Sequence, residues 1–542
     1  MLDDGVIEYR RLRAPREDGA TLIDPPWKAI GRLLADNLRL QSECDRVVGG
    51  RSLRDLQSDT RSELIDAARQ YTTTYANVSV PPTTGESPIV CTGHQPELFH
   101  PGVWLKDFAA DRLAREHRAL SLNLVIDSDM VGKMSVRVPT GAVADPVLES
   151  VPFDLNTGNA PFELTRIADH DCFESFGERA AETLAPLVAD PLVRSFWPLA
   201  IERSRAGARL GEAIAQARHR QEIDWGATNL ELPQSRACQS RGYRWLISHI
   251  LADLARFRES HNCALREYRR VHRIRNAAQP VPELHGDEDW LESPFWVYRN
   301  DMPVRRALWA RRSGKTLMLA DRAGWQYECA VGGDGDRDSM VEQLGELTRQ
   351  GVHIRTRALT TTMFARLLLS DLFIHGIGGA KYDQLTDAII LDYFGMRPPA
   401  FLTVTGTLKL PIPRSVPRQG REREIAGVLR NMRFHPERVL LNGHAALPQA
   451  QAWLVRKDAW IQSVQSAPAG HVSAAQHEEI SQINQRLSAM LDDERERLLV
   501  EQQELSRQMR SEAVLGSREY AFCLHPEAKL RSLMLALPAK KA

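Results

Sequence analysis

The sequence predicts an α/β protein whose parallel-sheet core is assembled from two separated segments, with a helical insertion between them and a C-terminal coiled coil. Three observations support this prediction. A strand–helix–strand pattern begins at residue 89, and alternating helices and strands return near residue 345. The run between them has helical periodicity. Residues 471–515 form a charged helix with a narrow apolar stripe, which is typical of a coiled coil.

Composition narrows the class of protein and of partner. A chain of 542 residues is too long for one hydrophobic core, so about two to four structural units are expected. Lys plus Arg and Asp plus Glu both number 70, so we expect neither nucleic acid nor a membrane as partner. Seven cysteines without a CxxC pair, and no apolar N-terminal segment, predict a cytoplasmic protein with reduced thiols.

Residues 1–85 are expected to form a mostly helical N-terminal leader. Apolar residues recur with helical spacing at Ile30–Leu38 and again at Leu56–Tyr71. The Pro- and Gly-containing segment 80–88 is a linker by composition.

Residues 86–171 are expected to supply the first half of the core. Strand Ile89–Cys91, helix Val103–His117 and a strand at 121–126 form a βαβ unit, whose two strands are predicted to be adjacent and parallel. The second strand ends in Asp127 and Asp129.

The rest of the chain divides into four further segments. The predicted segments are a helical insertion at 172–285, a small β-rich segment at 286–344, the second half of the core at 345–412, and a helical C-terminal region at 413–542. Within the second half we expect a helix up to Phe373, a Gly-rich loop at 375–381, a helix at 383–394 and a strand at 400–405.

The 471–515 helix predicts a homodimer. A helix this charged needs an apolar partner surface, because its own propensity cannot hold it. The preceding helix is shorter, so we expect it to leave Leu491 and Leu498 free for a second chain, with Glu494 and Gln502 interrupting the seam. The stripe consists of Ile480, Ile483, Leu487, Leu491, Leu498, Leu505 and Met509.

Polar residues follow both strands of the first βαβ unit. Thr92, His94 and Gln95 come after the first strand, and two aspartates come after the second. Because open parallel sheets bind ligands outside the carboxyl ends of their strands, this pattern predicts a ligand site. Neutral histidine and amide side chains suit hydroxyls, phosphates or an adenine edge.

Two other interpretations of the same residues remain open. His94, His100, Asp127 and Asp129 could form a mixed nitrogen–oxygen metal site, but they lack the close-spaced pair that tethers most such sites, so no metal is predicted. Alternatively, the histidines only cap the following helix. Cys91 lies within the strand and is interpreted as a small core residue.

The segment 375–383, HGIGGAKYD, predicts an anion site. Its glycines precede a helix, where free backbone N–H groups and the helix dipole favour a phosphate or carboxylate, and Lys381 adds a charge. The alternative is a tight turn in which glycine only relieves steric strain. RRSGKTL at 311–317 is not a P-loop, because Trp309 stands where the first glycine is required.

The order of these motifs resembles the cysteine-adding enzymes of bacillithiol biosynthesis. Their first core strand ends in a TGQQ-like loop, similar to Thr92–Gln95 here, and their second strand ends in acidic residues. Their late Gly-rich loop, helix, Phe-Gly pair, proline and strand follow the same order as residues 375–404. The chain departs from that pattern at His94 and at Gly379–Lys381, where the family has Gln and Pro-Gly-Glu.

The resemblance, which spans residues 89–515, implies a Rossmann-like core related to class I nucleotidylyl transferases and a coiled-coil homodimer. It implies a ligase that joins an amino acid, cysteine in that family, to an amino-sugar acceptor such as glucosaminyl malate, with ATP or ADP as the nucleotide. A nucleotidylyl transferase on the same core, or a non-catalytic coiled-coil assembly protein, is the alternative.

Site roles follow from the strand-end pattern and the Gly-rich loop together. We expect His94 and His100 to be the catalytic candidates, His94 by hydrogen bonding the ligand and His100 as an acid or base. The residues expected to bind substrate or nucleotide are Thr92, Gly93, Gln95, Asp127, Asp129, Gly376, Gly378, Gly379 and Lys381.

Overall fold

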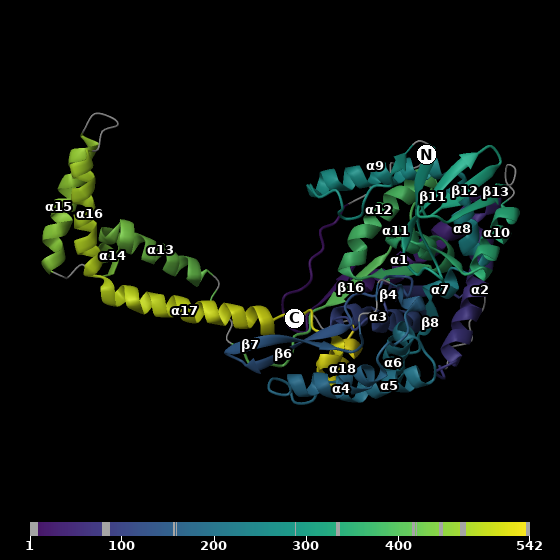
Figure 1. The fold of residues 1–542 in the computed structure, drawn as a ribbon, viewed down its shortest axis with the longest axis horizontal. Helices are drawn as coiled ribbons and strands as arrows, with labels where there is room; N and C mark the ends of the chain where they lie inside the picture. The colour runs from purple at the N-terminus through teal and green to yellow at the C-terminus, as the bar shows by residue number, and fades with distance from the viewer. Residues whose placement is uncertain are drawn as a thin grey trace. The chain divides into compact units, whose positions relative to one another are not determined.

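The computed structural model divides into two compact units. The larger unit comprises Met1–Val138, Glu149–Pro411 and Arg518–Ala542, and the smaller comprises Pro139–Leu148 and Ile412–Ser517 (Figure 1). The structure describes residues 9–78, 87–155, 158, 160–287, 289–331, 337–414, 418, 420–443, 448–466 and 473–537. The linker predicted at 80–88 lies almost wholly outside these ranges.

The core of the larger unit is a mixed sheet of six strands with the order β1-β16-β15-β4-β5-β8. Five strands run parallel, and β1 pairs with β16 antiparallel at one edge. The strands are β1 (Thr21–Asp24), β4 (Ile89–His94), β5 (Leu120–Val125), β8 (Leu230–Pro233), β15 (Leu372–His375) and β16 (Leu402–Gly406).

The predicted βαβ unit is confirmed. Strands β4 and β5 are adjacent and parallel, with Cys91 opposite Leu122, and helix α3 (Pro101–His117) connects them. Pro101 stands at the first position of α3, where its missing N–H costs nothing, and Arg118 ends the helix in the left-handed conformation (φ 54°). Every residue of β5 is buried, so both faces of the sheet are covered.

Strand order reverses between β4 and β15. The chain moves outward from β4 to β5 and β8, then returns to the other side of β4 to form β15 and β16. Such a reversal leaves a crevice at the carboxyl ends of the two central strands.

Two segments contribute strands that the sequence analysis does not predict. The N-terminal leader contains the expected helices α1 (Ile30–Ser42) and α2 (Leu53–Thr73), but it also supplies edge strand β1. The helical insertion likewise contains β8, the third parallel strand. Both strands have only four residues, too few to show a period in the sequence.

The prediction of one helix up to Phe373 is wrong. Helix α11 (Ala358–Phe364) continues as a π-helical turn to Leu369, and Leu372–His375 is strand β15, at the centre of the sheet. A short apolar run fits a buried strand as well as a helix, so periodicity does not separate the two. The Gly-rich segment is also not a loop, because helix α12 (Ile377–Tyr393) begins within it.

The β-rich segment forms a second, antiparallel sheet with the order β13-β12-β11-β10-β14. Strand β14 comes from the segment assigned to the core and pairs with β10 instead. The strands are β9 (Gly286–Asp287), β10 (Trp290–Arg299), β11 (Arg306–Ser313), β12 (Thr316–Ala320), β13 (Gln326–Ala330) and β14 (Val352–Thr356). Two hairpins, β2 (Val47–Val48) with β3 (Arg51–Ser52) and β6 (Ser135–Ala142) with β7 (Asp145–Pro152), complete the strands described.

Helices from distant parts of the chain build the core around the main sheet. Leu64 of α2 and Leu246 of α8 share one apolar cluster with Ile89 and Cys91 of β4. In the described residues no helix is long and apolar enough to span a membrane. The other helices of this unit are α4 (His170–Leu184), α5 (Val193–Arg205), α6 (Leu210–Asp224), α7 (Gln234–Ala237), α8 (Arg241–Ala252), α9 (Leu254–His272), α10 (Asp338–Arg349) and α18 (Glu527–Leu535).

The smaller unit is helical, and the continuous helix predicted at 471–515 is two helices in the described part of that range. One helix ends at Ala489 and the next begins at Asp492. Figure 1 shows α15 beside α16 and α13 beside α17. The helices are α13 (Arg421–Phe434), α14 (Pro436–Gly443), α15 (Pro448–Gln465), α16 (Ala474–Ala489) and α17 (Asp492–Leu515).

Most of the apolar stripe of this unit is covered within the chain, although Met509 at its end stays exposed. Leu491 and Leu498 are 3% and 4% exposed, in a cluster with Ile425 and Met432 of α13 and Leu440 of α14. The expectation that these two leucines are left free is therefore wrong, because α13 and α14 cover what the preceding helix does not.

Candidate functional site

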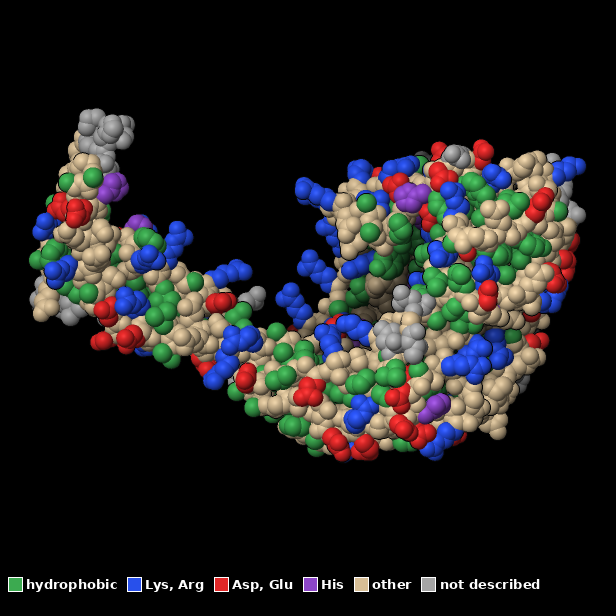
Figure 2. All heavy atoms as spheres, viewed as in Figure 1, with side chains coloured by type: hydrophobic (Ala, Val, Ile, Leu, Met, Phe, Trp, Pro, Cys, Tyr) green, Lys and Arg blue, Asp and Glu red, His purple; other side chains and the backbone are tan. Residues whose placement is uncertain are grey.

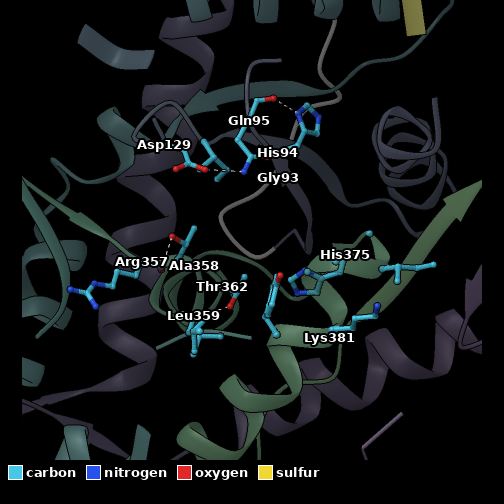
Figure 3. Close-up of a pocket in the computed structure, with 18 of the residues that line it drawn as sticks. Gly93, His94, Gln95, Asp129, Arg357, Ala358, Leu359, Thr362, His375 and Lys381 are labelled. Carbon is cyan, nitrogen blue, oxygen red and sulfur yellow. Dashed lines mark hydrogen bonds between the residues drawn. The ribbon is translucent and has the colours of Figure 1, made fainter. Parts of the chain in front are cut away.

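A cavity of about 1000 Å³ opens at the strand-order reversal of the main sheet. Its lining includes every sequence-predicted site residue except Thr92 and Asp127. Figure 3 shows His94, Gln95 and Asp129 on one side of this cavity and His375 and Lys381 on another. The predicted lining residues are Gly93, His94, Gln95, His100, Asp129, Gly376, Gly378, Gly379 and Lys381. The face of the larger unit seen in Figure 2 is hollowed, with apolar side chains inside the hollow and Lys and Arg beside it.

Thr92 and Asp127 do not line this cavity. Thr92 is fully buried in β4, and its hydroxyl donates to the carbonyl oxygen of Ile374 in the next strand (3.2 Å). Asp127 accepts hydrogen bonds from the backbone N–H (2.8 Å) and the hydroxyl of Ser235. Burial, reinforced by the nearby charge of Glu163, raises the pKa of Asp127 to about 7. Thr92 thus links β4 to β15, and Asp127 links the segment after β5 to the segment after β8.

His94 is the last residue of β4 and is fixed at both ring nitrogens. Its Nε2 lies 2.9 Å from Asp107 Oδ2, and its Nδ1 lies 3.2 Å from the carbonyl oxygen of Gln95. Burial, then the positive charges of Arg218 and Lys106, lower the pKa of His94 well below its ordinary value. Both ring nitrogens face oxygen atoms of the protein, so the imidazole positions the Gln95 loop rather than offering a free nitrogen to a ligand.

His100 is the N-cap of α3, as the capping interpretation expects. The backbone N–H of Gly102 donates to its Nδ1 (3.1 Å). Burial lowers the pKa of His100 to about 4. Its Nδ1 is engaged by the cap, which leaves Nε2 as the ring nitrogen for the acid/base role predicted for His100.

His375, which the sequence analysis does not select, occupies the matching position on the neighbouring strand. It ends β15, and its Nε2 lies 2.7 Å from Asp383 Oδ2. Its Nδ1 lies beside Gly379, where a Cβ would stand only 2.6 Å away, so this glycine is required for the close approach. No hydrogen-bond partner of that nitrogen is found in the described part of the chain. The sequence signal for His375 is its place in HGIGG, directly before the helix.

Asp383 is itself held by charge. Arg366 donates to its Oδ2 (2.7 Å), and the hydroxyl of Thr362 donates to its Oδ1 (2.6 Å). Burial alone would raise its pKa, but Arg366 and His375 hold the pKa below its ordinary value. An ionised Asp383 fixes the orientation of His375.

The first turn of α12 lines the cavity with backbone N–H groups that have no helical acceptor. Gly376 is its N-cap without a side-chain cap, and the first helical hydrogen bond runs from Ala380 N–H to the Gly376 carbonyl (2.9 Å). The N–H groups of the three residues between them have no helical acceptor. The space beside Gly378 is open, and Lys381 has no ion-pair partner among the described side chains. Free N–H groups, the helix dipole and this lysine all favour a phosphate or carboxylate.

The opposite wall carries aromatic and basic groups from the second sheet. The guanidinium groups of Arg305 and Arg357 lie 4.7 and 4.1 Å from the centre of the Trp296 ring. Arg305 also donates to Asp129 Oδ1 (2.6 Å), and Gln95 donates to Asp129 Oδ2 (3.1 Å). Asp129 therefore joins the two sheets at the cavity. The sequence shows this segment as aromatic and basic, but not that it faces the site.

A buried charge cluster supports the His94 side of the site. Arg218 of α6 is completely buried and donates to Glu222 (3.2 Å) and to Glu231 of β8. Its Nε also lies 3.9 Å from Asp107 Oδ2. Lys106 of α3 donates to the Gly93 carbonyl (2.7 Å), and burial lowers its pKa to about 8. Through Lys106 and Asp107 of α3, these contacts hold the carboxyl end of β4 in place.

No protein-family model matches the chain, and no curated protein is similar enough to count as a match. Among the described residues, no group of three or more His, Cys, Asp or Glu side chains is arranged to hold a metal ion.

We predict that Arg218→Met destabilises the larger unit by about 3–5 kcal/mol, because it leaves buried carboxylates without their partner. The free energy of unfolding in urea measures this. The control is Arg220→Met on the same helix, where a surface pair with Glu202 is lost and about 0–1 kcal/mol is expected. An equal effect of both variants would contradict the prediction.

The raised pKa of Asp127 predicts a pH dependence. Unfolded Asp127 releases its proton near its ordinary pKa, whereas the folded protein keeps that proton up to about pH 7. As the pH rises from about 4 to about 7, the folded state should therefore lose up to about 1.4 kcal/mol per pH unit relative to Asp127→Asn. Urea unfolding of both proteins at several pH values tests this, and a constant difference would refute it.

Proposed function

We propose that the larger unit is a Rossmann-like nucleotide-binding core that catalyses a ligase reaction at the reversal of its strand order. If the five parallel strands are numbered in chain order (β4, β5, β8, β15, β16), their order across the sheet from β8 is 3-2-1-4-5. This is the doubly wound order 3-2-1-4-5-6 without its last strand. In such sheets the ligand lies outside the carboxyl ends of the strands at the switch point, which is where the cavity opens.

The observation that carries the proposal is the pairing of an anion site with a polar wall across one cavity. The α12 N-terminus and Lys381 suit the phosphates of ATP or ADP. Gln95 and Asp129 on the other side suit the hydroxyl or amino groups of an acceptor. A volume of about 1000 Å³ is at the upper end of small-molecule sites, so there is room for two ligands.

The resemblance supplies the choice of substrates within this proposal. It favours an amino acid, cysteine, as the group joined and an amino sugar such as glucosaminyl malate as acceptor, with a carbon–nitrogen bond formed. We assign the phosphate to Gly376, Gly378, Gly379 and Lys381. We assign acid/base work to His375 in place of His100, because His375 has a ring nitrogen beside the anion site.

A nucleotidylyl transferase is the second candidate. It is favoured by His375, which ends a central strand beside the α12 N-terminus, where the phosphates of a bound nucleotide would lie. A coiled-coil assembly protein with a vestigial pocket is the third interpretation. It requires that the cavity bind none of these ligands.

Titration calorimetry with ATP, ADP, cysteine and glucosaminyl malate separates the three. Saturable binding of nucleotide and acceptor supports the ligase, nucleotide alone supports the transferase, and no binding refutes both. We expect Lys381→Gln to weaken nucleotide binding at least about tenfold, since a charge-assisted hydrogen bond is lost. The matched control is Lys133→Gln, an exposed lysine that does not line the cavity, which should leave binding unchanged.

We also propose that the smaller unit forms a homodimer, now through residues other than the covered leucines. Leu499 and Met509 of α17 remain 42% and 43% exposed. Replacing both with Glu should convert a dimer to a monomer in light scattering, with Glu496→Lys, which leaves the apolar surface intact, as control. A wild-type protein that is monomeric at micromolar concentration would contradict the proposal.

A further inference from the structure

The larger unit contains a second cavity, of about 510 Å³, which shares no lining residue with the first. It lies beside the carboxyl ends of β5 and β8, and most of its side chains are polar. Its lining comprises Asp127, Phe162, Glu163, Leu164, Arg166, Gly207, Arg209, Glu212, Ser235, Arg236, Gln239, Asn300, His353 and Arg355.

Three of its four arginines have no acidic partner among the described residues. Arg166 is exposed, and its side chain has no hydrogen bond or ion pair with the described part of the chain. Arg236 lies over the ring of Tyr71, 4.8 Å from its centre. Arg209 donates to the carbonyl oxygen of Glu163, which carries no full charge. Three guanidinium groups thus face one cavity without a carboxylate to balance them.

Each acid of the cavity already accepts hydrogen bonds from another residue of the lining. Glu163 receives two hydrogen bonds of 2.8 Å from buried Arg355, so these two charges cancel. Glu212 accepts from the backbone N–H of Arg209 (3.0 Å) as part of a helix cap. Asp127 is bound to Ser235, and its raised pKa reduces its negative charge near neutral pH. Glu212 keeps its negative charge, but the four arginines of the lining outnumber its three acids, so the cavity has a net positive charge.

We propose that this second cavity binds a small polyanion that carries phosphate or carboxylate groups. A guanidinium group donates in a planar fork that matches both groups and bonds them in pairs. A bound anion would also relieve the mutual repulsion of Arg166, Arg209 and Arg236. Gln239 and Asn300 add neutral amides that can bind hydroxyl or further oxygen atoms of the same ligand.

The two cavities share a wall, because neighbouring residues at three strand ends face opposite sides. Asp127 lines the second cavity, and Ser128 and Asp129 line the first. Likewise, Ser235 and Arg355 line the second cavity, and their neighbours Gln234 and Thr356 line the first. In β14 successive side chains of the extended strand point to opposite sides, which explains the division between Arg355 and Thr356. The second cavity is thus a separate site built on the same strand ends.

The test is calorimetric titration of the full chain with pyrophosphate and, separately, with citrate, in a buffer without phosphate. The variant Arg166→Gln/Arg236→Gln removes two unpaired charges but none of the side-chain hydrogen bonds found in the described structure. The control Arg306→Gln/Arg397→Gln removes two exposed arginines that line neither cavity. All variants are also made with Lys381→Gln, which removes the charge proposed to bind anions in the first cavity.

In the Lys381→Gln background we expect saturable binding of at least one polyanion, weakened at least tenfold by Arg166→Gln/Arg236→Gln and unchanged by the control pair. Pyrophosphate binding alone indicates a phosphate ligand, and citrate binding alone a carboxylate ligand. No binding in that background, or equal binding by both double variants, overturns the inference. Binding that is lost with the arginine pair but unaffected by Lys381→Gln supports the second cavity while removing support from the proposed function of the first.

Discussion

The buried guanidinium group of Arg218 needs carboxylate partners, and the ion pairs that it forms hold together the elements around the first cavity. A guanidinium group without exposure is stable only when carboxylates surround it. Its partners come from three elements: Glu222 from α6, Glu231 from β8 and Asp107 from α3. Because Asp107 also binds His94, the same charge sets the end of β4 and the first loop of the cavity. The helical insertion therefore determines the geometry of a site to which it contributes few lining residues.

The same arrangement occurs twice at the centre of the sheet. Each of the two central strands ends in a histidine, and each histidine is bound by a buried aspartate from the following helix. Each aspartate in turn lies beside a buried arginine, Arg218 in one case and Arg366 in the other. The difference lies in the second ring nitrogen, which contacts a carbonyl oxygen in His94 and lies beside the α12 N-terminus in His375. One histidine thus shapes the cavity, and the other faces its anion site.

The smaller unit follows a simpler rule. Its helices carry many charges, and they are held by one apolar cluster to which α13 and α14 contribute Ile425, Met432 and Leu440. Because the chain breaks between α16 and α17, apolar residues of both helices pack into that one cluster instead of lining one straight helix. Stability of the unit therefore needs no second chain, and any dimer must use side chains that remain exposed.

Local pattern in the sequence determined the first βαβ unit, the β-rich region, and nine of the residues that line the first cavity. Each depends on residues that are close in the sequence, where spacing and turn chemistry act directly. Only the tertiary structure decided that β8 and β15 are strands, that His375 faces the site and His100 caps a helix, and that a second cavity exists. Those features rest on contacts between distant residues, such as Arg355 with Glu163, 192 positions apart. The behaviour of a buried charged side chain depends on the groups packed against it, and those groups are usually far away in the sequence.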